Sequence, residues 1–227
     1  MKNNQLNEKR DISSLLHRID EIKKIDKKRK KLLDTFCEEL SSREEPSDNL
    51  IYVADQLFEI GKFEIKHNKH SSAILPLFAA LVTYKLFKDD ENLMKCYGYL
   101  DTCLKKFETE ALNWHEWDNA YISYLTLWLS KKYVLEEELP LFPEYLNEVH
   151  PLLREVAVRL DMFLKGETTL ASINELFHEV NNIATKYSFE KMWGIFKEVV
   201  TIIGYMHQKE MMKGVVAEEA NEENAEI

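Results

Sequence analysis

Two Glu-x-x-His pairs are the strongest candidates in this sequence for residues that carry out chemistry. Glu64 and His67 form one pair, and Glu175 and His178 form the other. On a helix this spacing places a carboxylate and an imidazole on one face. Helical bundles that hold two iron or manganese ions use two such pairs together with glutamates from two further helices. One alternative is therefore a helical-bundle metalloprotein whose ligands are these four residues.

Surface charge is the other interpretation of the same residues. The chain has 7 His and 40 Asp and Glu, so about one such pair is expected by chance. His67 falls at the expected end of a helix, and we expect Glu64 to face solvent. This interpretation predicts neither a metal nor a cofactor.

Patterns that mark other enzymes are absent from the sequence. It contains no Walker or Gly-x-Gly-x-x-Gly phosphate loop and no Gly-x-Ser-x-Gly nucleophile elbow. Its three cysteines lack a neighbouring base or a redox partner motif. We therefore predict no catalytic residue, and the sequence leans toward a protein that is not an enzyme.

A dense basic run lies near the N-terminus and is opposed only by Asp26. It consists of Lys23, Lys24, Lys27, Lys28, Arg29, Lys30 and Lys31. Such a run predicts a site for phosphate, anionic lipid or an acidic partner, and a solvated helix face is the alternative. No aromatic residue is interleaved, which disfavours stacking on nucleic-acid bases.

An aromatic helix face follows later in the chain. Its residues recur every three or four positions: Trp114, Trp117, Tyr121, Leu125 and Trp128. Such a face either fills a core or anchors a partner in a groove. Trp114 and Trp117 stand at the polar start of the helix, so they are the partner-binding candidates.

Helices must position all of these residues. The segment from Ser71 to Phe87 is the most continuously apolar, and we expect it to be the central helix of the fold. Amphipathic periods before and after it predict about seven helices in all. Six Gly and five Pro are few for a many-turned β protein. The predicted fold is all-α, either a bundle or a short irregular solenoid of helical hairpins.

Three parts are expected along the chain: an N-terminal helical arm at 1–45, a main helical domain at 46–214 and an acidic flexible tail at 215–227. Apolar residues from Asp11 to Leu40 recur at close to the 3.5-residue spacing of a coiled coil. Asp26 and Arg29 interrupt this seam. The arm is therefore either one long helix with a polar waist, which would project from the body, or two helices joined near Lys27.

Composition and charge limit the classes of partner and the cellular compartment that we expect. A net charge of −10 argues against a general binder of nucleic acid or membrane surfaces. The N-terminal residues have no apolar signal core, and an odd cysteine count without a Cys-x-x-Cys pair indicates a reducing compartment. We expect a cytoplasmic protein without a membrane span.

Residues 57–80 resemble one tetratricopeptide repeat. Leu57, Ile60, Gly61, Ala73, Leu77 and Ala80 stand at that family's spacing, whereas Glu64 replaces its usual aromatic residue and Lys85 its closing proline. The resemblance implies stacked antiparallel helix pairs with a concave surface that binds peptides or partner helices.

The function that we expect is a non-enzymatic protein- or peptide-binding module, such as an adaptor, chaperone, immunity-type or regulatory protein. Self-association through the first helix is compatible with it. The alternatives are the metalloprotein above and a nucleic-acid or anionic-surface binder that acts through Lys23–Lys31.

Overall fold

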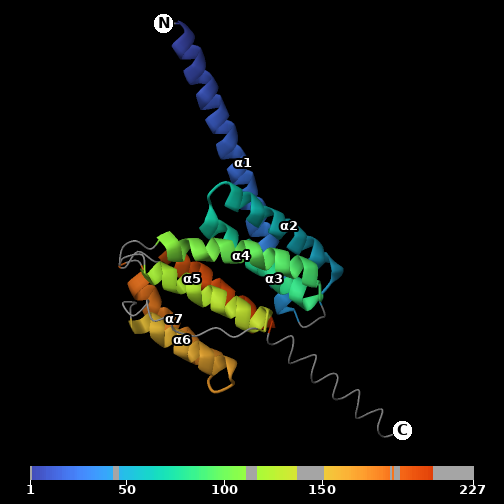
Figure 1. The fold of residues 1–227 in the computed structure, drawn as a ribbon, viewed down its shortest axis with the longest axis vertical. Coiled ribbons are helices and arrows are strands. Elements are labelled where there is room, and N and C mark those ends of the chain that lie inside the picture. The colour runs from blue at the N-terminus through green and yellow to red at the C-terminus, as the bar shows by residue number, and fades with distance from the viewer. Residues whose placement is uncertain are drawn as a thin grey trace, which may run out of the picture.

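The computed structural model describes residues 2–42, 46–110, 117–136, 151–184, 186 and 190–206. The side chains of residues 2–21, 107–119, 164 and 170 lie outside this description. Every regular element within the described ranges is helical, and the predicted all-α class is confirmed (Figure 1).

The labelled elements are α1 (Lys2–Ser41), α2 (Asp48–Lys66), α3 (His70–Leu86), α4 (Asp90–Glu110), α5 (Trp117–Leu129), the π-helical turn η2 (Ser130–Val134), α6 (Pro151–Leu164) and α7 (Leu170–Ala184). A further helix spans residues 190–206. Consecutive helices pack side by side, α2 on α3, α3 on α4, α4 on α5 and α6 on α7. The fold is thus a series of helical hairpins.

Helix α3 lies at the centre of this arrangement, as its sequence predicts. It contacts α1, α2, α4 and η2, and every side chain from Pro76 to Tyr84 is buried. A helix that is apolar all round is stable only when neighbours cover it on most sides. Here the neighbouring helices provide that cover.

Three helices end in the same way, which keeps their connections short. Asn68, Lys88 and Gly166 have φ angles of 59°, 58° and 74°. The N–H group of each of these residues donates to a carbonyl of the preceding turn, and so does the N–H group of the residue that follows it. These two hydrogen bonds form a Schellman motif. Asp89 then caps α4 by accepting the N–H of Asn92 at 3.1 Å. Glycine after a helix end and aspartate before a helix start are the residue types that favour these conformations.

Helix α1 is one continuous helix, so the two-helix alternative for the N-terminal arm is wrong. Its C-terminal half packs on α2 and α3, with Phe36 and Leu40 in the core. Its N-terminal half projects from the other described helices (Figure 1). The division of the chain at residue 45 stays a prediction, and the acidic tail at 215–227 lies outside the described residues.

The α2–α3 hairpin contains the segment that resembles a tetratricopeptide repeat. A Cβ atom at Gly61 would lie only 2.6 Å from Cδ2 of Leu77, so glycine permits the close approach of these helices. Leu57, Ala73 and Ala80 are buried at the same hairpin. Membership of that family stays a prediction.

Two of the three cysteines, Cys96 and Cys103, are buried in α4, whereas Cys37 on α1 is half-buried. Burial raises the pKa of the Cys96 thiol, so it is present as an inert, small apolar side chain. Among the described helices, none is long and apolar enough to cross a membrane.

Candidate functional site

The basic run lies on α1, whose orientation is fixed by the residues on its opposite face. Ile22 and Ile25 are half-buried, and Phe36 and Leu40 are fully buried against the body. Arg29 falls on this same inward face, four residues after Ile25. A helix with one face packed must turn its other residues outward.

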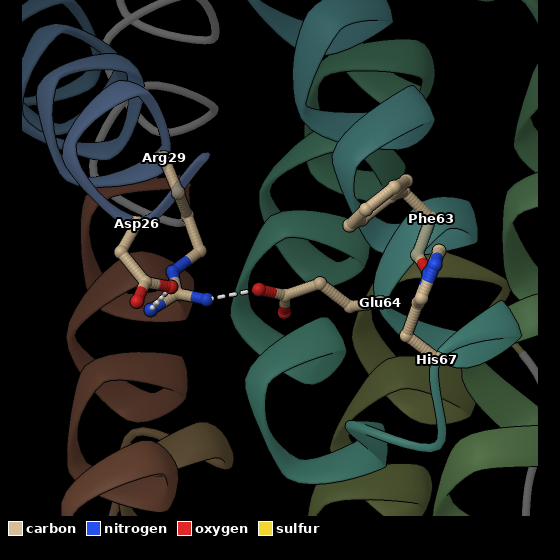
Figure 2. Close-up of polar contacts among 5 residues, drawn as sticks. All are labelled: Asp26, Arg29, Phe63, Glu64 and His67. Atoms are coloured by element: carbon tan, nitrogen blue, oxygen red, sulfur yellow. Dashed lines mark hydrogen bonds and ion pairs between the residues drawn. The ribbon is translucent and has the colours of Figure 1, made fainter. Parts of the chain in front are cut away.

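Arg29 crosses from α1 to a buried carboxylate on α2. Its Nη1 donates to Oε1 of Glu64, and its Nη2 lies 3.2 Å from Oδ1 of Asp26 (Figure 2). The Glu64 side chain is 1% exposed and that of Arg29 is 23% exposed. The expectation that Glu64 faces solvent is therefore wrong. An inward arginine on the neighbouring helix compensates the buried charge.

The charge of Glu64 remains only partly compensated. Its Oε2 is buried and has no hydrogen-bond partner among the described residues. Removal from water raises the pKa of this carboxyl, while Arg29 and Lys69 oppose that shift and Asp26 adds to it. Burial, with the negative charge of Glu64 as a further cause, raises the pKa of Cys103 to about 12.

The lysines of the run form an outward surface that we call the basic face of α1. All six are exposed: Lys23, Lys24, Lys27, Lys28, Lys30 and Lys31. Lys28 donates to Oε1 of Gln56 at 2.6 Å. None of the six forms an ion pair with a carboxylate of the described residues. The basic face therefore presents a cluster of exposed ammonium groups that can bind an anionic surface. Arg29 does not belong to this face, because it is paired with Glu64.

The Glu64/His67 pair does not converge on a common point. His67 follows the last residue of α2, and its ring lies against that of Phe63, with 4.0 Å between the centroids and 30° between the planes. Its Nδ1 lies 2.8 Å from the Phe63 carbonyl oxygen. Figure 2 shows these two rings on the side of α2 away from Arg29. Glu64 instead points toward α1.

The second pair lies on α7, where Glu175 and His178 are both exposed. His178 borders a groove of about 530 Å³ between α7 and the helix at 190–206. In the described part of the chain, no group of three or more His, Cys, Asp and Glu side chains could hold a metal ion. The structure does not bring the two predicted pairs together, so the metalloprotein stays a prediction that this geometry does not support.

The aromatic face is placed only in part. Tyr121, Leu125 and Trp128 are buried in α5, which fits the core interpretation for these three. The side chains of Trp114 and Trp117, the predicted partner-binding anchors, lie outside the described residues.

Sequence reasoning missed the pairing of Glu64 with Arg29, although a signal for it exists. Glu64 follows Leu57 and Gly61 by seven and three residues, so it continues the apolar stripe of α2. Arg29 likewise occupies an apolar position of the α1 seam. Opposite charges at apolar positions of two adjacent helices indicate a buried ion pair.

No protein-family model, curated protein sequence or solved structure matches this chain.

Proposed function

We propose that this chain is a non-enzymatic protein-binding module that holds an acidic surface of a partner protein on the basic face of α1. The observation that carries the proposal is the exposure of six lysines without a described carboxylate partner, in a chain with a net charge of −10. Elsewhere on the surface, lysines such as Lys62, Lys95 and Lys105 are paired with nearby acids. The unpaired cluster is thus a local departure from the rest of the surface.

A protein partner suits this face better than a nucleic acid. The basic face spans only residues 23–31, which is about 12 Å of helix. The remainder of the chain is acidic and repels an extended polyanion. An acidic patch on a folded protein or peptide is of matching size, and complementary charge of this kind gives specificity and rapid association.

The test compares two variants with the same change of charge. The first reverses the centre of the basic face with Lys24→Glu, Lys27→Glu and Lys31→Glu. The control reverses exposed lysines on α4 and the helix at 190–206 with Lys95→Glu, Lys105→Glu and Lys191→Glu. Each protein captures partners from nuclease-treated lysate of its own source, and every captured protein is purified and titrated against all three.

We expect one acidic protein to bind the wild type and the control with similar affinity. Loss of three exposed charge contacts at about 1 kcal/mol each would weaken its binding to the first variant by roughly 100-fold. Equal binding to both variants would refute the role of the basic face. Binding of duplex DNA or of anionic vesicles with the same dependence on these lysines, and no protein partner, would replace the proposal with the polyanion alternative.

A further inference from the structure

The seam of α1 follows a heptad pattern that extends beyond the body of the protein. One set of positions is Ile12, Ile19, Asp26, Leu33 and Leu40, and the set that follows each by three residues is Leu15, Ile22, Arg29 and Phe36. Apolar residues at both sets of positions are typical of a helix that packs along another helix. The pattern is interrupted only at Asp26 and Arg29.

The body covers the C-terminal part of this seam. Phe36 and Leu40 are buried, and Arg29 is matched by Glu64 of α2. Ile22 is only half-buried. The N-terminal half of α1 projects from the other described helices (Figure 1). The polar positions at 26 and 29 therefore lie near the N-terminal end of the covered part of the seam.

The projecting part of the seam needs a partner. A single helix in water gains little stability from its own hydrogen bonds, and most helix stability in proteins comes from packing of an apolar face. Four apolar heptad positions, at residues 12, 15, 19 and 22, precede the polar pair. We infer that a second copy of this chain covers them, so that two α1 arms pair in antiparallel orientation over residues 12–22.

The distribution of charge favours a second copy and sets the orientation. Residues 2–21 carry four basic and four acidic side chains, so two arms meet without net repulsion. Residues 22–31 carry seven basic side chains and one acidic side chain. Parallel arms would place the two basic faces side by side, where like charges repel. Antiparallel arms place the two basic faces, and the two bodies, at opposite ends of the paired segment.

Sedimentation equilibrium of the full chain tests the association. The disrupting variant carries Leu15→Glu and Ile19→Glu, and the matched control carries Ser14→Glu and His17→Glu at heptad positions outside the seam. Unpaired charge buried in a seam is strongly unfavourable, so we expect association to weaken by about 100-fold or more in the first variant and to be unchanged in the control. Near-ultraviolet circular dichroism from the buried Trp128 and Trp193 verifies that each body remains folded.

Spin labels test the orientation. The label is attached at Asn4→Cys in a chain that carries Cys37→Ser, since Cys96 and Cys103 are buried. Antiparallel arms centred on residue 17 place the two labels roughly 40 Å apart, and parallel arms place them about 10 Å apart. A monomeric wild type, or dimers that the seam variant leaves intact, would overturn the inference, and the short distance would overturn the antiparallel arrangement.

Discussion

Removal of Arg29 will destabilise the protein far more than neutralisation of Glu64, although each change breaks the same ion pair. The two partners differ in their surroundings. Arg29 is 23% exposed and keeps Asp26 at 3.2 Å, whereas Glu64 is 1% exposed and its second oxygen has no described partner. Arg29→Met therefore leaves a buried, uncompensated carboxylate, and Glu64→Gln leaves a cation with another acid and with access to water.

The magnitude follows from the cost of protonating the stranded carboxyl. Breaking a buried pair by removing one partner costs about 3–5 kcal/mol. At pH 7 the carboxyl escapes much of this by taking up a proton. From its ordinary pKa of 4.5, that step costs about 2.5 × 1.36, or roughly 3.4 kcal/mol. For Arg29→Met we expect a loss of about 3 kcal/mol. For Glu64→Gln we expect about 1 kcal/mol, because the amide oxygen still accepts a hydrogen bond.

The dependence on pH separates this explanation from a simple loss of packing. Burial raises the pKa of Glu64 in the folded protein, so the unfolded chain loses this proton at a lower pH than the folded chain does. The contribution of Glu64 to the free energy of unfolding therefore falls as the pH increases above 4.5. The loss in Arg29→Met should therefore shrink to about 1 kcal/mol at pH 5, where protonation is nearly free. The loss in Glu64→Gln should change in the opposite direction and be larger at pH 5 than at pH 7, because the variant lacks the titrating carboxyl.

Urea denaturation of the wild type, both single variants and the double variant Arg29→Met with Glu64→Leu measures these differences. An apolar pair of similar volume restores much of the stability, since it removes both charges from the interior. Equal losses in the two single variants, or a loss in Arg29→Met that is the same at pH 5 and pH 7, would refute the reasoning.

Two further predictions concern the backbone. Gly61→Ala should destabilise the protein by about 1–3 kcal/mol because its Cβ would lie 2.6 Å from the Leu77 side chain. Gly98→Ala should stabilise it by about 0.5–1 kcal/mol because a Cβ atom at this position would have no atom of a neighbouring element within 4 Å. Thermal unfolding of both variants checks the difference in sign. Lys88→Gly should raise stability by about 1 kcal/mol, because Lys88 has a φ of 58° that glycine adopts without strain. An unchanged unfolding midpoint in urea would contradict this.

The sequence predicts individual helices well because their signals are local. The apolar character of residues 71–87 depends on neighbouring residues, and the corresponding helix, α3, begins and ends within one residue of the expected positions. The signal that decides between one and two N-terminal helices is not local. It depends on whether Arg29 finds a partner, and that partner, Glu64, lies on α2.

The candidate site was harder to predict for the same reason. The six lysines are exposed because apolar residues occupy the opposite face of α1, and the spacing of these apolar residues can be read from the sequence. Assignment of Arg29 to the interior, and of Glu64 to the same place, requires knowledge of which helices lie side by side. The Glu-x-x-His spacing predicts that Glu64 and His67 share one helix face, but α2 ends at Lys66 and the imidazole lies against Phe63.

The position of the ion pair also explains how α1 selects one register on the body. A heptad seam alone allows a helix to slide by seven residues with little change in apolar contact. Such a slip would place Ile22 or Phe36 opposite Glu64 and leave the carboxylate buried without a cation, which costs several kcal/mol. It would also move the basic face along the body by about 10 Å. The pair thus fixes where the six lysines stand and how much of the seam projects from the body.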